Sequence, residues 1–488
     1  MMPSDTCEVA IIGGGPSGLA AATTLSDYGL DTCLIDEQPR LGGQIYRQPP
    51  VGFAVQSWLA GRVYERGREL LERAERLAGL RHLAPATVWG LFASEPGCEP
   101  SGGHHVFYEQ AGRLGRVSAR RVLLATGCYE MPVPFPGWHL PGVMSAGGMQ
   151  TLLKSQRVAA GGHVVLAGSH PLLLVAAEQM LQAGVTIAAV VLSQPVTTAA
   201  RALRSPAALL GAFGQLLHAG HCLRRLRRAR VPLLFGRVIV EAVGDDAVAA
   251  VRVRHSDFHG ETREIACDAV GLCYGFLASS ELARQAGVRS AWEQGSGWVV
   301  AADPFMRSTV PGVSVAGELI GVAGAEAATL SGEIAALGIA VDAGRLTAEA
   351  ASARSRAPRR RLARVRRFAA LLAELSGPPP QLLSRLATPA TLVCRCEDVT
   401  IGALVAALRA EPAIESASAA KLLTRVGMGR CQGRMCELAV RRVISDCRGH
   451  PLSEVESYVP RPPVKPVSLA ALAAAAEVPS RQSNVDVA

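Results

Sequence analysis

A glycine-rich turn near the amino end constrains the fold more than any other feature of this sequence. A β-rich run, Val9 to Ile12, leads directly into Gly13-x-Gly15-x-x-Gly18, and a helical pattern and a second strand, "DTCLID", follow. Glycines at this spacing allow a tight turn, let the backbone approach a pyrophosphate and let the helix pack closely on its strand. The amino end of the helix then offers free N–H groups to phosphates. The pattern predicts a dinucleotide-binding unit in a doubly wound α/β sheet.

Several polar residues after this turn are candidates for holding the same ligand. Asp36 ends the second strand, where an acid binds the ribose hydroxyls of a dinucleotide, and Glu37 is the alternative if the strand ends one residue later. The following turn, "RLGGQIYR", brings Gly43 and Gln44 close behind the acid. We therefore expect this turn to lie at the bound cofactor.

Two later stretches indicate which dinucleotide is bound. The strand in "RVLLATGCYE" ends at Gly127, and "PGVSVAGELIG" carries Gly317 and Glu318. With the first loop, these stretches resemble the two-dinucleotide-domain flavoproteins, which include thioredoxin reductase and glutathione reductase. The resemblance implies FAD on the first loop and a ribityl contact from the acid after the late Ala-Gly, here Glu318 where the superfamily usually has Asp. The predicted FAD-binding residues are Gly13, Gly15, Gly18, Asp36, Gly43, Gln44, Gly127, Gly317 and Glu318.

A second stretch with the same strand–turn–helix–strand pattern lies in mid-chain, but its fingerprint is damaged. It reads Gly168-x-His170-x-x-Leu173, and its second strand ends in Leu192, Ser193 and Gln194, without an acid for a ribose. A side chain at position 170 obstructs a pyrophosphate, and Leu173 replaces the glycine of close helix packing. We expect a second α/β domain kept as a scaffold, with His170 as a phosphate ligand as the alternative. No CxxC pair accompanies this domain, which disfavours a dithiol relay.

Four of the twelve cysteines form two tight pairs near the carboxyl end: Cys394-x-Cys396 and Cys431-x4-Cys436. Four thiolates from two loops fit a [2Fe–2S] cluster or a zinc ion, and uncoordinated thiols are the remaining alternative. A one-residue gap combined with a four-residue gap is a poor zinc knuckle, and the arginines around the cysteines suit an anionic cluster. The pattern therefore favours [2Fe–2S].

The stretch "TLVCRCEDVT…KLLTRVGMGRCQGRMC" resembles the bacterioferritin-associated-ferredoxin-like [2Fe–2S] domain, in the CxxxxC form found fused to flavoprotein subunits. The order of motifs along nearly the whole chain resembles the larger flavin subunits of heteromeric, dye-linked amino-acid dehydrogenases. These include the opine oxidase A subunit, the alpha subunits of proline and D-hydroxyproline dehydrogenases, and the hydrogen cyanide synthase B subunit. The resemblance implies a partner flavoprotein similar to D-amino-acid oxidase that oxidises the substrate, and a further, small partner similar to ferredoxin.

These parts predict an architecture of two dinucleotide-binding domains and a small helical module. The expected limits are an FAD-binding domain in two parts, a degenerate second domain, a basic linker, a [2Fe–2S] module and an extended tail: 1–150 with 301–350, 151–300, 351–390, 391–450 and 451–488. The last residues, "VPSRQSNVDVA", are expected to be disordered.

The charge and the amino end narrow the classes of function. The net charge of +9 is concentrated in two basic stretches with helical spacing, 222–231 and 356–368, and no nucleic-acid recognition motif accompanies them. They are solvated helix faces or docking surfaces for an acidic partner or a membrane. No signal peptide and no long apolar run is present, so we expect a cytoplasmic chain without a transmembrane segment, with peripheral association at the inner face of the membrane as an addition.

The prediction is thus an FAD and [2Fe–2S] electron-transfer subunit of a multi-subunit oxidoreductase that oxidises an amino acid, an imino acid or an opine. Two alternatives stay open: a self-sufficient NAD(P)H-dependent reductase and a zinc-binding scaffold without redox activity. The sequence names no catalytic acid, base or nucleophile. It also leaves open the substrate, the stoichiometry and the electron acceptor.

Overall fold

A computed structural model describes residues 1–488 except 1–3, 51, 54–61, 96–101, 379 and 477–488. Within the described residues the first sheet has seven strands, in the order β3-β2-β1-β6-β5-β4, with β19 paired to the end of β6. Strands β1, β2, β3, β6 and β19 run parallel, whereas β4, β5 and β6 form an antiparallel meander. The strands are β1 (Ser4–Ile12), β2 (Thr32–Ile35), β3 (Leu80–Leu83), β4 (Thr87–Ala93), β5 (His104–Gln110), β6 (Arg113–Leu124) and β19 (Val313–Val315).

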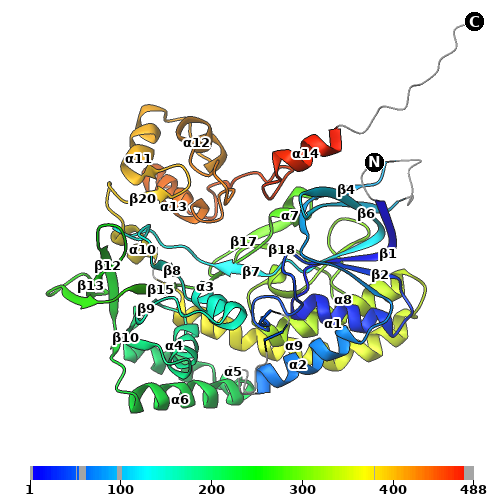
Figure 1. Ribbon diagram of the computed structural model, residues 1–488, viewed down its shortest axis with the longest axis horizontal. Coiled ribbons are helices and arrows are strands. Elements are labelled where there is room, and N and C mark those ends of the chain that lie inside the picture. Colours follow the sequence, from blue (N-terminus) through cyan, green and yellow to red (C-terminus); the bar gives the residue numbers. More distant parts are fainter. Residues whose placement is uncertain (1–3, 51, 54–61, 96–101, 379, 477–488) are drawn as a thin grey trace, which may run out of the picture.

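The second sheet has the same parallel character and is built from the middle of the chain. Its order is β11-β10-β9-β15-β8, from β8 (Val143–Ser145), β9 (His163–Gly168), β10 (Thr186–Leu192), β11 (Leu233–Phe235) and β15 (Ala269–Cys273). Helices α3 (Ala146–Thr151), α4 (Leu172–Gln182) and α6 (Phe213–Arg228) accompany it. A separate antiparallel sheet of β12 (Arg237–Val243), β13 (Ala250–His255) and β14 (Arg263–Ala266) lies beside it (Figure 1). Both sheets confirm the predicted α/β class.

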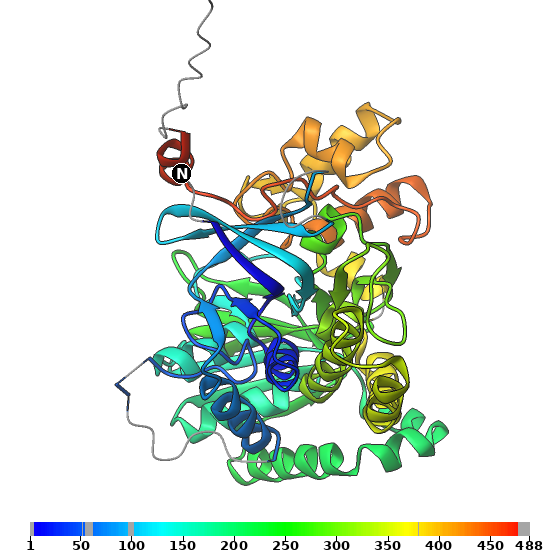
Figure 2. The same ribbon diagram turned by 90° about the vertical axis from the view of Figure 1, so that its right-hand side faces the viewer.

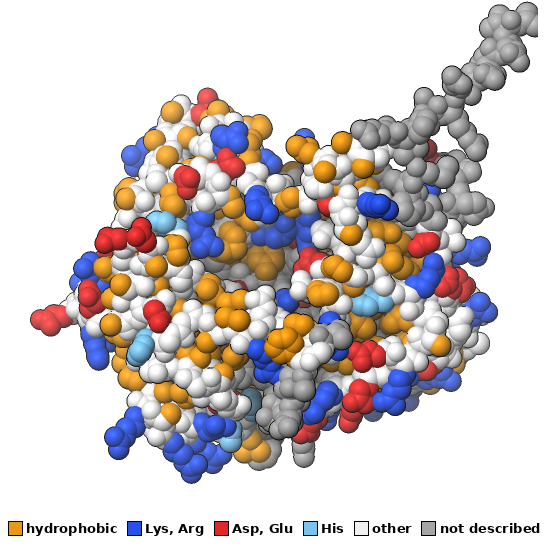
Figure 3. Space-filling model, in the orientation of Figure 1, with side chains coloured by type: hydrophobic (Ala, Val, Ile, Leu, Met, Phe, Trp, Pro, Cys, Tyr) orange, Lys and Arg blue, Asp and Glu red, His pale blue; other side chains and the backbone are white. Residues whose placement is uncertain are grey.

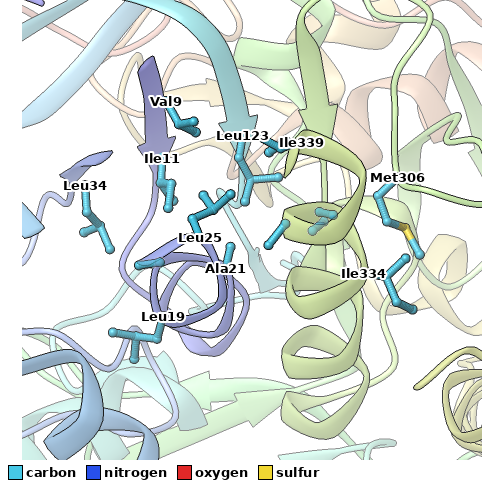
Figure 4. Close-up of a cluster of buried hydrophobic side chains, with 14 of the residues drawn as sticks. Val9, Ile11, Leu19, Ala21, Leu25, Leu34, Leu123, Met306, Ile334 and Ile339 are labelled. Carbon is cyan, nitrogen blue, oxygen red and sulfur yellow. The ribbon is translucent and has the colours of Figure 1, made fainter. Parts of the chain in front are cut away.

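Two helices fix the core beneath the first sheet (Figure 4). Helix α1 (Pro16–Ser26) begins with proline, whose fixed φ suits a first helical position, and it packs on α8 (Ala325–Asp342). Leu19 and Ile334 of these helices are fully buried in the same hydrophobic cluster as Ile11 of β1. The helices cross closely because Gly332 has no side chain: a Cβ there would lie 2.1 Å from the carbonyl oxygen of Ser17.

The predicted basic linker is largely one long helix. Helix α9 (Ala348–Ser376) starts at Thr347, whose hydroxyl caps the Ala350 amide, and it lies along α8. The Arg361–Glu326 ion pair, 2.5 Å between Nε and Oε1, joins the two helices. The short helix α10 (Pro380–Leu386) follows. The stretch 351–390 therefore belongs to the packed body of the protein.

The C-terminal module and the tail lie over the rest of the chain (Figures 1 and 2). The module contains a β20–β21 ladder (Leu392–Cys394, Val399–Thr400) and three helices around its own core: α11 (Ile401–Ala410), α12 (Ala417–Thr424) and α13 (Glu437–Arg448). The tail then runs across the first domain to α14 (Leu469–Ala476), which contacts β6. The described part of the tail is thus an arm that packs back on the first domain, and the final residues lie outside the described part.

Smaller elements join these units. Hairpin β17–β18 (Ser290–Glu293, Gly297–Val300), the pair β7–β16 (Cys128–Glu130, Phe276–Ala278) and helix α7 (Glu281–Gln285) lie between the sheets and the module. Helix α2 (Arg62–Glu75) packs against α1, and α5 (Pro206–Gly211) packs against α9. Among the described helices, none is long and apolar enough to cross a membrane.

Candidate functional site

A single cavity of about 950 Å³ brings the predicted dinucleotide residues together. Its walls come from the first glycine loop, the turn after β2, the Ala-Thr-Gly turn after β6 and the start of α8. Of the nine residues predicted to bind FAD, eight line it: Gly13, Gly15, Asp36, Gly43, Gln44, Gly127, Gly317 and Glu318. The ninth, Gly18, lies behind the loop.

The glycines of the first loop are required by backbone contacts. Gly13 has φ +110°, and a Cβ there would lie 2.3 Å from the carbonyl oxygen of Ala125. A Cβ at Gly18 would lie 1.9 Å from the carbonyl oxygen of Gly13. Gly18 therefore lets α1 start directly under the loop, which leaves the amino end of α1 open toward the cavity.

Asp36 is the buried acid of this loop. Its Oδ2 accepts a hydrogen bond from the Gly14 amide at 2.5 Å, and its Oδ1 accepts one from the Gln38 amide at 2.6 Å. Burial raises its pKa, and the two amide donors oppose that shift. Glu37, the alternative acid, also lines the cavity but is half-exposed and forms an ion pair with Lys465 of the tail.

The turn after β2 and the turn after β6 lie side by side in the cavity wall. Gly43 packs on Gly15, because a Cβ on Gly43 would lie 2.7 Å from the Gly15 Cα. The Gln44 amide donates to the Cys128 carbonyl at 2.8 Å, so this side chain bridges to β7. Both turns therefore form one continuous wall.

Glu318 begins the return segment and caps the loop before α8. Its carboxylate accepts from the amides of Gly324 at 2.8 Å and Ala323 at 3.2 Å, and the Cys128 thiol lies 3.9 Å away. Burial raises the Glu318 pKa to about 7, against these amide donors. The longer side chain in place of the usual aspartate is thus used to hold the start of α8 as well as to line the cavity.

The second loop is filled by its own side chains. The His170 ring accepts from the Leu172 amide at 3.1 Å, which occupies a donor at the start of α4, and Leu173 is fully buried. Burial lowers the His170 pKa to about 4, so the ring is neutral near pH 7. Gln194, where a ribose acid would stand, donates instead to the Ser376 carbonyl of α9 at 2.9 Å. His170 itself faces the first cavity, which it helps to line.

Sequence reasoning did not place any of the cationic residues of the cavity wall there: Arg47, Arg66, Arg73, Lys154, Arg361, Arg434 and Lys465. Lys154 is 4% exposed, lies 5.4 Å over the Tyr64 ring and, among the described residues, has no acidic partner. Burial, and then the charge of Arg47, lowers its pKa to about 8. The one available signal was composition, because two of the three lysines in this arginine-rich chain line the cavity.

The four predicted metal-ligating cysteines meet as two pairs. The Cys394 thiol hydrogen-bonds with that of Cys436, and the Cys431 thiol with that of Cys396. Gly429 closes on this group, since a Cβ there would lie 2.1 Å from the Cys396 Cβ. Within the described residues, however, no three His, Cys, Asp or Glu side chains gather as a site for a single metal ion.

The loop around Cys394 stabilises negative charge on its sulfur. The bond from Cys436, followed by the amides of Gly427, Cys396 and Glu397, lowers the Cys394 pKa to about 5. The pKa of Cys436 is raised in turn by its bond to Cys394 and by burial. Three non-glycine residues in these loops have positive φ: Asp398, Arg425 and Gln432. Backbone turns of this kind direct successive N–H groups toward an anion.

The fold and the cavity define a flavoprotein of the pyridine nucleotide-disulphide oxidoreductase class, and that family model matches residues 7–344. Residues 388–476, which include all four cysteines, match the model of the sarcosine oxidase A3 domain. Family membership indicates FAD as the cofactor, in agreement with the sequence prediction.

Two named relatives narrow the class. The chain is 35% identical to the opine oxidase A subunit of Agrobacterium tumefaciens, over 96% of this chain and 92% of the relative. It is 34% identical to hydrogen cyanide synthase subunit HcnB of Pseudomonas aeruginosa, over 87% of this chain and 90% of the relative. This chain therefore belongs to the family that contains HcnB and the opine oxidase A subunit, which confirms the resemblance drawn from the sequence.

Solved structures agree with this fold. L-proline dehydrogenase from P. horikoshii superposes with a TM-score of 0.70 at 22% identity, covering 97% of this chain and 80% of that chain. Thioredoxin reductase from T. acidophilum gives a TM-score of 0.51 at 18% identity, covering 69% of this chain and 99% of that chain. The second comparison leaves out about a third of this chain, whereas the first extends over nearly all of it.

Proposed function

We propose that this chain is the FAD and [2Fe–2S] electron-transfer subunit of a multi-subunit oxidoreductase that oxidises an amino acid, an imino acid or an opine. The observation that carries the proposal is the contrast between an open first loop and an occupied second loop on one chain. Because His170 and Leu173 fill the second loop in the described part of the chain, we expect the flavin to receive its electrons from a donor other than a nicotinamide dinucleotide.

The residues of the first cavity fit FAD. The start of α1 and the glycine backbone suit the pyrophosphate, Asp36 and Glu37 lie where a ribose is bound, and Gly317 and Glu318 lie where the superfamily resemblance places the ribityl chain. When bound, FAD supplies the conversion between a two-electron donor and one-electron acceptors. The chain positions the cofactor and surrounds its anionic phosphates with cationic side chains.

The two thiol pairs support a [2Fe–2S] cluster over zinc. A structural zinc ion takes four ligands around one point, whereas a [2Fe–2S] cluster has two irons, each bound by two cysteines. The pairs Cys394–Cys436 and Cys396–Cys431 suit the second arrangement. Cys396 is exposed, so a cluster held here would lie at the surface, where a partner has access to it.

The relatives support the proposed substrate class and the proposal of a partner subunit. HcnB and the opine oxidase relative are both named as subunits, and the proline dehydrogenase fold extends along almost the whole chain. We place substrate oxidation on a partner flavoprotein that resembles D-amino-acid oxidase, with a small ferredoxin-like protein as a further partner. The unpaired cysteines fit the reducing cytoplasm, and the basic helices α6 and α9 offer surfaces for peripheral membrane association.

The test is anaerobic purification followed by cofactor analysis of the full chain. We expect about one FAD and two irons per chain, with visible absorption from both, and no bleaching of the flavin by NADH. Rapid bleaching by NADH would contradict the proposed electron source. Zinc in place of iron would contradict the cluster.

Cysteine variants refine the cluster assignment. Cys396→Ser is expected to remove most of the iron and leave FAD bound, because its thiol belongs to the paired set. Cys447→Ser is the matched control, since Cys447 is also exposed but lies in α13 outside both pairs. Equal iron in the two variants would exclude Cys396 as a ligand.

A further inference from the structure

The C-terminal module and the tail form part of the wall of the dinucleotide cavity. Arg434, between two of the cluster cysteines, and Lys465 and Val464 of the tail, line the same cavity as Gly13 and Asp36. Figure 3 shows the surface hollowed where the module meets the first domain, with Lys and Arg side chains at the rim. A site that sequence motifs place at the amino end is therefore completed from residues about four hundred positions later.

Arg434 is the centre of this contact. Its Nε lies 3.1 Å from Glu281 Oε1, and both side chains are largely buried, at 17% and 14% exposure. Its two terminal nitrogens donate to the carbonyl of Cys431 at 3.3 Å and to that of Val464 at 3.2 Å. One guanidinium thus holds the cysteine loop, the tail and the cavity wall together.

The connection continues to the Ala-Thr-Gly turn. The Ser279 hydroxyl donates to the other oxygen of Glu281 at 3.2 Å, and the Thr126 hydroxyl donates to the Ser279 carbonyl at 2.7 Å. Thr126 and Gly127 line the cavity. A continuous chain of hydrogen bonds therefore leads from the cysteine loop to the turn that faces the cofactor.

The tail is attached to the first domain near Asp36. The Val464 amide donates to the Trp89 carbonyl at 2.9 Å, and the Val464 side chain is buried in the core of the first domain. Lys465 forms an ion pair with Glu37, the residue directly after the ribose acid Asp36. Further along the tail, Ser468 donates through its amide and its hydroxyl to Glu109 of β5.

We infer that Arg434 and Lys465 are dinucleotide-binding residues, and that FAD is held tightly only while the C-terminal module is docked. The inference rests on the proposed FAD site and adds the residues that close it. A dinucleotide carries two negative phosphates, and charge-assisted hydrogen bonds are about twice as strong as neutral ones. Both cations come from the C-terminal part, which makes cofactor retention dependent on its position.

The first experiment measures FAD affinity by fluorescence during reconstitution of the deflavinated full chain. Arg434→Met is expected to weaken binding roughly tenfold, the loss of one charge-assisted contact. Lys465→Met is expected to weaken it about threefold, because its more exposed charge is screened. The matched controls, Arg430→Met and Arg461→Met, are exposed, lie in the same two segments and do not line the cavity. Equal affinity in all four variants would overturn the inference.

Glu281→Gln separates a cofactor contact from a structural ion pair. The amide keeps the shape of Glu281 and weakens one attachment of Arg434, while the guanidinium keeps its bonds to the Cys431 and Val464 carbonyls, so FAD affinity should fall by less than in Arg434→Met if Arg434 acts on the dinucleotide. A loss equal to that of Arg434→Met would mean that the ion pair only supports the fold, which would overturn the role given to Arg434.

Lysine acetylation provides a second readout of the closed wall without any variant. We expect FAD to slow acetylation of Lys465 and to leave Lys421 of α12, outside the cavity, unchanged. Equal labelling of Lys465 with and without bound FAD would contradict the closed wall, while FAD binding itself would stand. Failure of the unmodified chain to bind any FAD would instead refute the proposed function.

Discussion

The two glycine loops have the same strand–turn–helix topology, but the first is lined by glycine backbone and the second is filled by side chains. In the first, Gly18 lets α1 begin directly under the loop, and the amino end of the helix faces a large cavity. In the second, the His170 ring covers an amide at the start of α4, and Leu173 fills the position of the last glycine with a buried side chain. The comparison shows that this topology supports either ligand binding or packing, and that two or three side chains decide between them.

The largest effect is expected from a substitution that disrupts the first loop and lowers FAD affinity. Gly18→Ala places a Cβ against the Gly13 carbonyl, so the loop shifts and FAD affinity should fall by roughly a hundredfold or more, about 3 kcal/mol. FAD content per purified chain and a fluorescence titration measure the loss. Gly220→Ala in α6 is the control, since nothing lies within 4 Å of its Cβ. Normal FAD binding by Gly18→Ala would mean that the loop tolerates a wider turn.

A substitution in the second loop should lower the free energy of unfolding and leave FAD affinity unchanged. Leu173→Ala removes a fully buried side chain, and the free energy of unfolding should fall by about 3 kcal/mol, while FAD affinity stays at the wild-type value. Urea denaturation measures the free energy of unfolding, and the same fluorescence titration measures FAD affinity. A large loss of FAD affinity would show that the second loop contributes to the cofactor site and would weaken the contrast.

The pH dependence of stability tests the state of His170. Its pKa is lowered to about 4 by burial, against about 6.5 in the unfolded chain, so between these values the unfolded state binds more protons. The free energy of unfolding should therefore rise with pH across this window, on the order of 2 kcal/mol from this residue.

His170→Asn should remove that slope, and urea denaturation at several pH values measures the difference from wild type. The opposite sign, a contribution that falls as pH rises, would mean a charged His170. That result would favour the alternative in which His170 binds a phosphate.

The smallest effect concerns the end of β10. Gln194→Leu removes the hydrogen bond to the Ser376 carbonyl, and the free energy of unfolding should fall by about 1 kcal/mol. NADH should fail to bleach the flavin in this variant as in the wild type. Bleaching in the variant alone would show that this contact is what excludes a nucleotide.

Much of the fold and half of the site follow from local sequence. Gly13, Gly127 and Gly317 have positive φ, so the backbone dictates glycine there and leaves a readable pattern. The loss of the second fingerprint can also be read from the sequence, because His170 and Leu173 stand where the pattern requires glycine. The two α/β sheets follow from the strand–helix alternation around these loops.

The remaining site residues have no local pattern. Lys154, Arg434 and Lys465 reach the cavity from a helix, a cysteine loop and the tail, and only the tertiary packing brings them together. The basic stretch 356–368 is predicted as a helix, but its position along α8 depends on contacts such as Arg361–Glu326. Sequence spacing does not encode contacts between segments this far apart.

The contacts of the C-terminal module also bear on how the two halves of the flavoprotein can move. The Trp138 indole, which is buried in the core around the second sheet, donates to the Leu392 carbonyl at 2.8 Å, and Arg395 stacks 4.4 Å over its ring. On the other side, Arg284 of α7 donates to the Tyr458 carbonyl at 2.8 Å. The module is therefore attached to both halves of the flavoprotein, and a swing of one half against the other would break one of these attachments. The docked module therefore opposes hinge motion between the two halves of the flavoprotein.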